Sequence, residues 1–472
     1  MGRGPLSRII MEEIRQGRMP GLEVVCLISD DALPATNLPV YHSKELSLAI
    51  QKHSIRKIYI TDPVAGQSKR RLQRELARQG VACKILPDLK ELLESSLSAP
   101  PLEDLLKRPQ VILRDEAVEA LVRDRTVLIT GAGGSIGAEI VRQLASLDAS
   151  ALVLVDAAET ALVEIDRELR ESTRAPERLA SVVGDIRDRA FLSRLFQDFD
   201  IQIVFHCAAY KHVPMMELNP GQAVQNNVIG TVQLANAARD AGVERFVMIS
   251  TDKAVNPVNV MGATKRIAEL YIQNLARTCD TRFITVRFGN VLGSQGSVIP
   301  LFNRQIDAGG PVTVTHPDII RYFMTIPEAA SLVLQAGAMG KEGEIFILDM
   351  GEPLRIKDLA EDLIRLRGLE PHRDIEIRYI GLRPGEKLFE ELFQHDEAEQ
   401  PTHHPRIRVA SSRFLSLGTL IAQIQELESA ARSYQRQAID EIMSRILPEY
   451  RPARSEPPSQ ARLESWYNLE AV

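Results

Sequence analysis

The sequence predicts an α/β fold: a Rossmann-like doubly wound parallel sheet with a C-terminal subdomain, preceded by a smaller degenerate α/β domain. Two observations carry this prediction. Short β-rich runs alternate with helical patterns along much of the chain, as in parallel sheets built from strand–helix–strand units. One stretch, RTVLITGAGGSIGAEIVRQLASL at 125–147, joins an apolar strand, a glycine-rich turn and an amphipathic helix.

Residues 1–100 are predicted to form the smaller domain. LEVVCLIS at 22–29 and IRKIYIT at 55–61 are β-rich runs, and SKELSLAIQKH between them has a helical pattern. A third run and a helix are expected in KILPDLKELLESS at 84–96. The opening, GRGPLSRIIMEEIRQG, resembles a glycine turn that enters a helix without a preceding strand, so the domain is degenerate or its chain begins earlier.

Composition sets the other boundaries. Residues 101–122 hold proline and mixed charge, which predicts a linker, and a larger domain is expected over 123–450. Residues 451–472 are rich in Pro, Ser and charge, which predicts a flexible tail.

Bulk properties exclude several classes of protein. Of the 472 residues, 44% are hydrophobic and 25% are charged, which is ordinary for a globular protein. The net charge of −6 gives no indication that the protein binds nucleic acid or an anionic membrane surface. The four cysteines lie far apart and no histidines share ligand spacing, so we expect neither a disulfide framework nor a metal site, in a reducing compartment. No run of about 18 apolar residues and no signal peptide occur, which favours a soluble, cytoplasmic protein.

A nucleotide site is predicted at the glycine-rich turn. Gly131, Gly134 and Gly137 form G-x-x-G-x-x-G, which lets backbone N–H groups approach a pyrophosphate at a helix N-terminus. A lone glycine motif is a weak signal, because any tight strand–helix turn can use glycine. Here a second strand, ALVLVD, ends in Asp156, where a carboxylate can bind ribose hydroxyls. Two alanines follow it, with no Arg for a 2′-phosphate, which favours NAD over NADP.

Two more strand ends extend this site. Asp185 and Ile186 follow one strand, where an adenine amino group is expected, and Ala208 and Ala209 follow another, where small side chains permit close approach. The predicted cofactor contacts from these patterns are Gly131, Gly134, Ser135, Ile136, Gly137, Asp156, Asp185, Ile186, Ala208 and Ala209. A doubly wound domain with an empty site is the alternative.

The stretch STDKAVNPVNVMGATKR at 250–266 carries the expected chemistry. Many nicotinamide enzymes use a Ser or Thr, a Tyr, and a Lys four residues after that Tyr. Here Lys265 is present, but Met261 stands four residues before it, and a thioether neither gives nor takes a proton. Either the chain is an inactive copy or the proton chemistry has moved to other residues.

Thr251, Asp252 and Lys253 can supply that chemistry, because they follow a strand at the edge where such sheets bind ligands. Asp252 can act as a general acid if it is buried, since desolvation disfavours a carboxylate. Lys253 can act as a general base if Lys265 and a positive nicotinamide lower its pKa. Thr251 can relay a proton from a substrate hydroxyl. An adjacent acid and base can eliminate water; an exposed ion pair of little value is the alternative.

From about Pro100 to Pro452 the chain resembles the nucleoside-diphosphate-sugar 4,6-dehydratases of polysaccharide biosynthesis, in the extended short-chain dehydrogenase/reductase superfamily. It resembles in particular the large membrane-anchored UDP-N-acetylglucosamine 4,6-dehydratases, in which Met replaces the usual Tyr. The motifs that carry the resemblance occur in order: TGAGGSIGAEI, AAYKHVPMME, STDKAVNPVNVMGATKR, TVRFGNVLGSQGSVIPLF, RYFMTIPEA and RPGEKLFEEL.

The resemblance implies a function and a set of contacts. Residues 123–450 would be an NAD(P)-binding catalytic domain, with its substrate-binding part mainly after residue 288. It would convert a UDP-N-acetylhexosamine into a 4-keto-6-deoxy sugar with tightly bound NAD, or NADP. The implied catalytic residues are Thr251, Asp252, Lys253, Met261 and Lys265, and Lys211 and Lys265 would also contact the cofactor. The implied substrate contacts are Lys211, Asp252, Lys253, Asn290, Arg321, Arg383 and Glu386.

Partners and rival functions complete the expectations. We expect a UDP-sugar substrate, a homo-oligomer, and membrane association through a missing N-terminal segment or a partner, at the inner face of the membrane. A dehydratase that inverts C5 or a nucleotide-sugar epimerase is the first alternative. A non-catalytic nucleotide-binding scaffold is the second.

Overall fold

The computed structural model divides the chain into two compact units, Met1–Pro100 and Pro101–Val472, each with its own apolar core. The residues that it describes are 24–29, 38–53, 55, 57–60, 81–85, 116–147, 149–172, 178–341, 343–394, 397–410 and 416–452.

The first unit pairs short parallel strands beside one helix. Strands β1 (Leu27–Ile28) and β2 (Val40–Tyr41) pair in parallel, as do β3 (Lys57–Ile60) and β4 (Ala82–Ile85). The helical pattern at 43–53 forms η1 (Ser43–Glu45) and α2 (Leu46–His53), which buries Leu46, Ala49 and Ile50 against Ile28 and Ile58. The expected glycine turn at the N-terminus and the helix after Pro87 lie outside the described residues.

The second unit is built on a nine-stranded sheet in the order β18-β19-β15-β10-β9-β8-β5-β6-β7. Neighbouring strands are parallel except β15–β19 and β18–β19. From β5 the chain continues to β6 and β7 on one side, and then crosses to β8, β9 and β10 on the other side of β5. The strand order therefore reverses between β5 and β8, and this reversal is the switch point at which such folds bind ligands. The strands are β5 (Thr126–Thr130), β6 (Ala151–Asp156), β7 (Leu179–Val183), β8 (Ile203–His206), β9 (Arg245–Thr251), β10 (Arg282–Phe288), β15 (Ile345–Leu348), β18 (Glu399–Pro401) and β19 (Ile407–Ala410).

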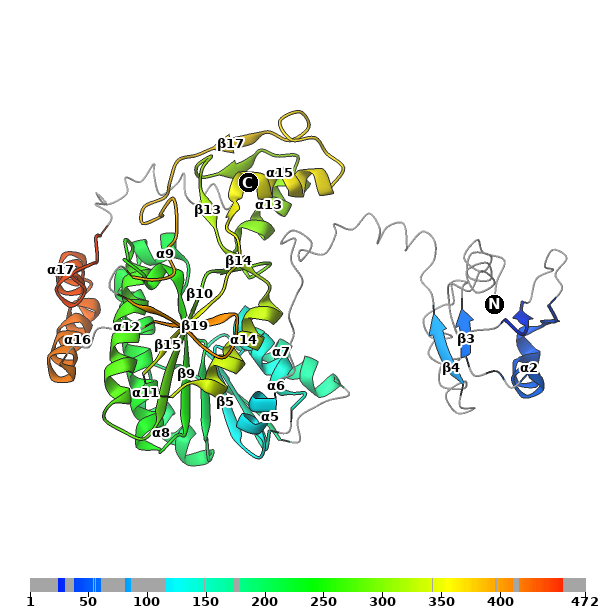
Figure 1. The fold of residues 1–472 in the computed structure, drawn as a ribbon, viewed down its shortest axis with the longest axis horizontal. Helices are drawn as coiled ribbons and strands as arrows, with labels where there is room; N and C mark the ends of the chain where they lie inside the picture. Colours follow the sequence, from blue (N-terminus) through cyan, green and yellow to red (C-terminus); the bar gives the residue numbers. More distant parts are fainter. Residues whose placement is uncertain are drawn as a thin grey trace. The chain divides into compact units, whose positions relative to one another are not determined.

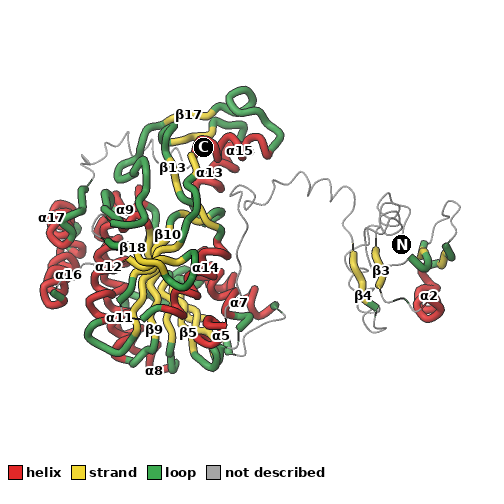
Figure 2. The backbone as a smooth tube through the Cα atoms, viewed as in Figure 1, coloured by secondary structure: helices red, strands yellow, loops and turns green. Residues whose placement is uncertain are grey.

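Helices cover both faces of this sheet, so the unit has three layers (Figures 1 and 2). Strands in the middle of the sheet, such as β5, β6 and β8, are buried on both faces, which explains continuous apolar runs such as LVLV in β6. One face carries α8 (Arg189–Asp198), α11 (Thr231–Asp240) and α12 (Val260–Ala276), and the other carries α6 (Ser135–Leu144), α7 (Glu159–Glu171) and α14 (Ile326–Met339). The predicted doubly wound α/β fold is confirmed.

Two C-terminal helices complete the layer around α12. Helices α16 (Leu417–Arg432) and α17 (Arg436–Ile446) pack against each other, and α16 packs against α12 and against η3 (Val224–Gly230), a π-helical segment between α10 (Pro220–Ala223) and α11. All 17 residues of α12 are buried. Its polar side chains therefore need partners inside the protein.

Part of the expected linker is helical. Residues Glu116–Val122 form α5, which packs against α14 and buries Val118 and Val122 in the sheet's core. The charged sequence of 101–122 concealed this apolar face, which spans only two turns. The rest of that segment, 101–115, lies outside the described residues.

A smaller lobe stands beyond the carboxyl ends of the strands. It has its own core, in which Phe302, Val312 and Leu363 are buried. Its elements are β11 (Asn290–Val291), α13 (Val298–Asp307), β12 (Val312–Val314), β13 (Ile320–Arg321), β14 (Phe323–Met324), β16 (Leu354–Arg355), α15 (Ile356–Leu366) and β17 (Ile377–Tyr379). Helix α9 (Val213–Leu218) packs instead against α12.

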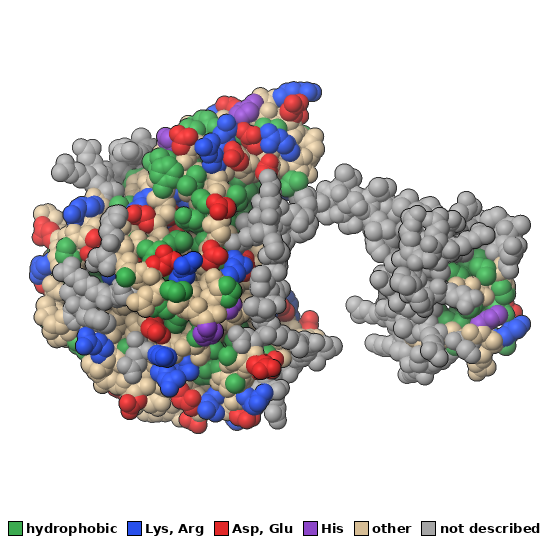
Figure 3. Space-filling model, viewed as in Figure 1, with side chains coloured by type: hydrophobic (Ala, Val, Ile, Leu, Met, Phe, Trp, Pro, Cys, Tyr) green, Lys and Arg blue, Asp and Glu red, His purple; other side chains and the backbone are tan. Residues whose placement is uncertain are grey.

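Charge and helix length bear on the partner predictions. Lys or Arg and Asp or Glu side chains are interspersed on the face of the second unit that Figure 3 shows, so the described part of that face carries no basic stripe. Within the described ranges no helix combines the length and apolarity that a membrane span needs. Those ranges also hold no cluster of three or more His, Cys, Asp or Glu suited to a metal ion. Membrane association and homo-oligomerisation stay predictions.

Candidate active site

A cavity of about 870 Å³ opens at the carboxyl ends of β5, β8 and β9, beneath the smaller lobe. It collects most of the residues that the sequence singles out, although they come from segments up to 255 positions apart, Gly131 to Glu386. The predicted residues that line it are Gly131, Gly134, Ser135, Ile136, Gly137, Ala209, Lys211, Thr251, Lys253, Met261, Lys265, Asn290, Arg321, Arg383 and Glu386. Five predicted residues do not line it: Asp156, Asp185, Ile186, Ala208 and Asp252.

The glycine-rich turn is tight enough to require glycine. Gly131 has a φ of 68°, and a Cβ on it would lie 2.6 Å from the backbone N of Ala208. A Cβ on Gly137 would lie 2.1 Å from the carbonyl oxygen of Gly131. Helix α6 then begins with Gly134 as its N-cap, which supplies no side-chain cap. The first N–H groups of this helix therefore face the cavity without a side-chain acceptor at the cap.

The two carboxylates that are predicted to bind the nucleotide, those of Asp156 and Asp185, differ in their surroundings. Asp156 accepts hydrogen bonds from the backbone N of Gly133 and of Ala158, both at 2.9 Å, so it stands beside the glycine turn. Asp185 instead binds the Arg187 guanidinium, with Nη2–Oδ2 at 2.6 Å, and this hydrogen bond lowers its pKa. An adenine amino group at Asp185 would share the carboxylate with Arg187, which the sequence analysis did not foresee.

Thr251, Asp252 and Lys253 stand where β9 turns into a one-turn helix, η4 (Asp252–Ala254). Asp252 Oδ1 accepts hydrogen bonds from Thr251 Oγ1 and from Lys253 Nζ, both at 2.9 Å. Lys253 Nζ also donates to Asn290 Oδ1 at 3.1 Å. The Asp252 side chain is fully buried and that of Lys253 is 18% exposed, so the two form a buried pair and not the exposed pair of the alternative interpretation.

Asp252 lies just behind the cavity wall, which differs from its predicted substrate contact. Its Oδ2 is buried and has no hydrogen-bond partner among the described residues. A Cβ added to Gly289, which lines the cavity, would lie 3.2 Å from this oxygen. Asp252 therefore reaches the cavity across a residue without a side chain, or through Thr251 and Lys253.

The protonation of Lys253 differs from the sequence-based expectation. Burial by itself lowers the pKa of its ammonium, but the carboxylates of Asp252 and Glu390 more than offset burial and hold the pKa above its ordinary value. The expectation considered only Lys265 and a bound nicotinamide, and it left out these two carboxylates. Glu390, which lies 137 positions along the chain, was not foreseen.

Lys265 and Met261 face the cavity from the first turns of α12. Burial lowers the pKa of Lys265 to about 8, against the attraction of Glu269. Met261 is 3% exposed and gives this wall an apolar surface where the usual Tyr would stand. Beside them His206 is buried between two threonine hydroxyls, and burial followed by the charge of Lys265 lowers its pKa to about 3, so it is a neutral structural residue.

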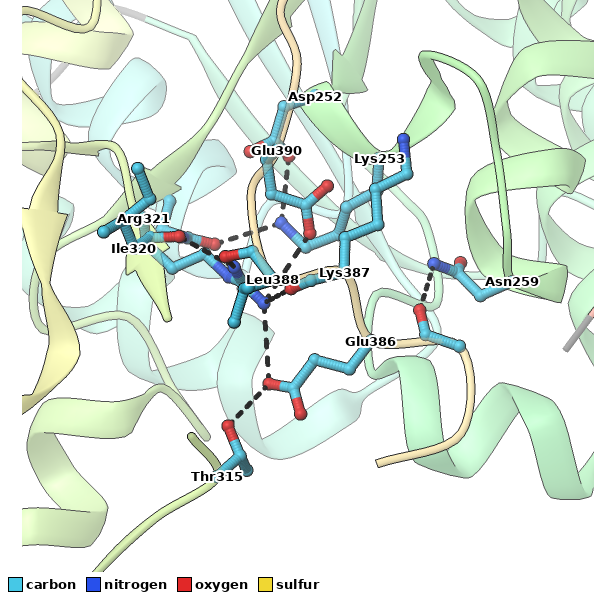
Figure 4. A network of polar contacts seen from close by, with 12 residues as sticks. Asp252, Lys253, Asn259, Thr315, Ile320, Arg321, Glu386, Lys387, Leu388 and Glu390 are labelled. Atoms are coloured by element: carbon cyan, nitrogen blue, oxygen red, sulfur yellow. Dashed lines mark hydrogen bonds and ion pairs between the residues drawn. The ribbon is translucent and has the colours of Figure 1, made fainter. Parts of the chain in front are cut away.

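The smaller lobe supplies the other side of the cavity (Figure 4). Arg321 donates to the carbonyl oxygens of Ile320 at 2.7 Å and Lys387 at 2.8 Å, and lies 3.5 Å from Glu386. It therefore fastens the segment 383–391 to β13, in addition to lining the cavity. Arg383 on the same segment also lines the cavity. At the opposite wall, burial and then the charge of Lys253 lower the pKa of Lys211.

Sequence reasoning missed two residues of this site. Glu390 is buried beside Lys253 and Arg321, and its position in the motif RPGEKLFEEL was the only signal for it. Gln295 donates its backbone N–H to Ser135 Oγ at 3.3 Å, which ties a loop of the smaller lobe to the glycine turn. Its position in the motif TVRFGNVLGSQGSVIPLF was the signal for Gln295.

A buried ion cluster supports the catalytic strand and helix from behind. Arg287 on β10 is fully buried and donates to both oxygens of Glu269 at 2.8 and 2.7 Å, and to Glu397 at 2.6 Å. Ser250 Oγ donates to Glu269 at 2.6 Å, and Arg266 Nη1 does so at 3.0 Å. Burial alone would raise the pKa of Glu269, but Arg287 and Arg266 lower it to about 2. The cluster joins the residue before Thr251 to the residue after Lys265.

Known proteins share this arrangement of fold and motifs. A family model described as polysaccharide biosynthesis protein matches residues 127–412, more than half of the chain. The chain belongs to this family. The probable polysaccharide biosynthesis protein EpsC of Bacillus subtilis (strain 168) is 43% identical over 423 residues, which cover 87% of this chain and 71% of EpsC.

Solved structures share the fold of this chain. Pen from Bacillus thuringiensis is 33% identical with a TM-score of 0.56, over 64% of this chain and 99% of Pen. DesIV, a dTDP-glucose 4,6-dehydratase from Streptomyces venezuelae whose double mutant was solved with NAD bound, has a TM-score of 0.50 over 67% of this chain and 99% of its own. At 22% identity, DesIV shows a shared fold alone. The predicted membership of a polysaccharide biosynthesis family is confirmed.

Proposed function

We propose that this polysaccharide biosynthesis protein is a UDP-N-acetylglucosamine 4,6-dehydratase, which makes a 4-keto-6-deoxy sugar for a surface polysaccharide or glycan. The buried pair of Asp252 and Lys253 beside Thr251 carries this proposal. An adjacent acid and base are what the elimination of water requires, whereas simple oxidation of an alcohol requires one base. Met261 has no acid–base function, whereas Thr251 and Lys253 line the cavity and Asp252 lies directly behind its wall, bonded to both.

The residues around the glycine turn fit an NAD-type dinucleotide, which we propose as the resident cofactor. The uncapped start of α6 would bind the pyrophosphate, Asp156 the adenosine ribose and Lys265 the nicotinamide ribose. When bound, this cofactor takes a hydride from sugar C4 and returns one to C6, so the reaction has no net redox change.

The proton balance of the reaction gives Thr251, Asp252 and Lys253 one task each. Thr251 takes the proton of the C4 hydroxyl and passes its own to Asp252 along their 2.9 Å hydrogen bond. Lys253 removes the C5 proton, which the 4-ketone acidifies, and later returns it to C5. Asp252 protonates the departing C6 hydroxyl, which leaves as water. All three residues then have their starting protonation again. This balance requires that Lys253 starts as a neutral amine. One proton must therefore leave the pair of Asp252 and Lys253 before turnover.

The test is incubation of the purified protein with UDP-N-acetylglucosamine, without added cofactor, followed by mass spectrometry. Loss of one water is expected, and it would also show that the cofactor is retained during purification. An unchanged mass with an inverted C4 or C5 would identify an epimerase instead. If no substrate is changed, even with NAD or NADP added and with other nucleotide sugars, the result would favour a non-catalytic nucleotide-binding scaffold.

The replacement Gly137→Ala is expected to remove the cofactor. The new Cβ would lie 2.1 Å from the Gly131 carbonyl, so the turn must open, at a cost of about 1–3 kcal/mol in folding free energy. Cofactor released from denatured protein, quantified by mass spectrometry, measures the loss. Gly418→Ala is the matched control, because a Cβ at that position of α16 meets nothing within 4 Å. Equal cofactor content in both variants would argue against a dinucleotide on this turn.

A further inference from the structure

Asn259 is a buried residue whose side chain binds two different walls of the cavity. It is 3% exposed and stands at the N-cap of α12, where its Oδ1 accepts a hydrogen bond from the backbone N of Gly262 at 2.7 Å. Its Nδ2 donates to the carbonyl oxygen of Gly385 at 3.0 Å (Figure 4). Because the cap needs an acceptor, it also fixes which end of the amide faces Gly385. The proposed mechanism gives Asn259 no task.

The two partners of Asn259 belong to elements that line the cavity. Helix α12 presents Met261 and Lys265 to it. Gly385 lies in a turn between Arg383 and Glu386, which both line the cavity. The backbone N of Glu386 donates to the carbonyl oxygen of Arg383 at 3.0 Å, and the Glu386 carboxylate accepts from the backbone N of Arg383 at 3.0 Å. Since the turn is closed by its own hydrogen bonds, a displacement of Gly385 would move both side chains.

The contact between Asn259 and Gly385 is close. Gly385 has a φ of 74°, and a Cβ on it would lie 2.6 Å from the Cβ of Asn259. Two further hydrogen bonds join the catalytic loop to the segment beyond Glu386: Lys387 Nζ to the Val255 carbonyl oxygen at 3.0 Å, and Asn256 Nδ2 to Glu391 Oε2 at 3.2 Å. Asn259 instead holds the turn that carries Arg383.

We propose that Asn259 is a positioning residue, which sets the place of Arg383 relative to the side chains of α12. Lys265 on that helix would hold the cofactor, and the guanidinium of Arg383 suits the diphosphate of a sugar nucleotide. An aspartate could also cap the helix, but a carboxylate has no proton to donate to Gly385. The effect on substrate binding rests on the proposed function, whereas the attachment of segment 383–391 to α12 does not.

Hydrogen–deuterium exchange tests this attachment without any substrate. Full-length wild type, Asn259→Asp and Asn274→Asp are exchanged and digested, and peptides that cover 383–391 are followed by mass spectrometry. Asn259→Asp keeps the cap but sets two oxygens against each other at Gly385, so amides of 383–391 are expected to exchange about tenfold faster. Asn274→Asp is the matched control. It removes a buried amide donor of the same helix, bound to the Leu270 carbonyl at 2.7 Å, and should leave exchange in 383–391 unchanged.

Turnover gives the second measurement. In Asn259→Asp the KM for UDP-N-acetylglucosamine is expected to rise about tenfold while kcat stays within about twofold of wild type, because Arg383 would bind ground state and transition state alike. A merely structural role would reduce the active fraction, and so kcat, at an unchanged KM. Gly385→Ala, whose Cβ would push the turn away from Asn259, should raise KM likewise, and adding Asn259→Asp to it should have little further effect.

The outcomes separate the positioning role from the proposed function. Equal exchange of 383–391 in wild type and Asn259→Asp would overturn the proposal, and so would faster exchange with an unchanged KM. If wild type dehydrates no sugar nucleotide, titration calorimetry with UDP takes the place of KM. Weaker UDP binding by Asn259→Asp would then retain the positioning role and reject the proposed function, whereas equal binding would overturn both.

Discussion

Lys253→Met is expected to lower dehydration of UDP-N-acetylglucosamine by about 10³-fold, and Asp252→Asn by about 10²- to 10³-fold. Methionine has nearly the length of lysine but cannot accept the C5 proton, and asparagine cannot donate a proton to the C6 hydroxyl. Loss of water, followed by mass spectrometry with excess protein over long incubation, measures both rates.

The controls separate lost chemistry from lost structure. Lys357→Met removes an exposed lysine on α15 that pairs with Glu361, and it should turn over as wild type does. Both catalytic variants should retain cofactor, because neither residue belongs to the glycine turn. Near-wild-type rates in Lys253→Met and Asp252→Asn together would remove the assignment of acid and base, and with it the observation on which the proposed function depends.

Arg287→Met is expected to lower the free energy of unfolding by about 3–5 kcal/mol, because it removes one of the two guanidinium groups that compensate the buried carboxylates of Glu269 and Glu397. The pKa of Glu269, about 2 in the wild type, should rise. A carboxyl group with a lowered folded pKa stabilises the protein above its unfolded pKa, and that stability is lost as pH falls toward the folded pKa. Urea unfolding at neutral pH and again near pH 3 measures both effects.

Arg282→Met, on the same strand, is the matched control. Arg282 is exposed at the start of β10, so its replacement should change stability by at most about 0.5 kcal/mol. Between neutral pH and pH 3, the free energy of unfolding should fall less in Arg287→Met than in wild type. Equal unfolding midpoints for the two variants would mean that the buried cluster contributes little net free energy, as some buried ion pairs do.

The parts of the site that could be predicted are those that a short stretch of chain specifies by itself. The glycine turn, Asp156 and the run of Thr251, Asp252 and Lys253 each lie at a strand end that periodicity locates. The resemblance to sugar-nucleotide dehydratases added Asn290 and Arg383, which line the same cavity. Their roles toward cofactor and substrate stay predictions.

Two of the unpredicted parts are local in the sequence, and a third depends on segments that lie far apart in the chain. The sequence showed Asp185 and Arg187 as two nearby residues but did not indicate that their side chains pair. The charged residues around α5 concealed its apolar face. The raised pKa of Lys253 depends first on the adjacent Asp252 and then on Glu390, which lies far along the chain.

The sequence by itself determined the class of fold, the family and the chemical groups at the reactive end, because strand periodicity, glycine spacing and adjacent polar residues are local properties of the chain. Tertiary structure alone decided which of those groups are buried and which charges face them. Burial and charge set the protonation of Lys253 and place Asp252 behind the cavity wall. Both arise from packing between segments, since an electric field in a protein depends on distance in space and not on distance along the chain.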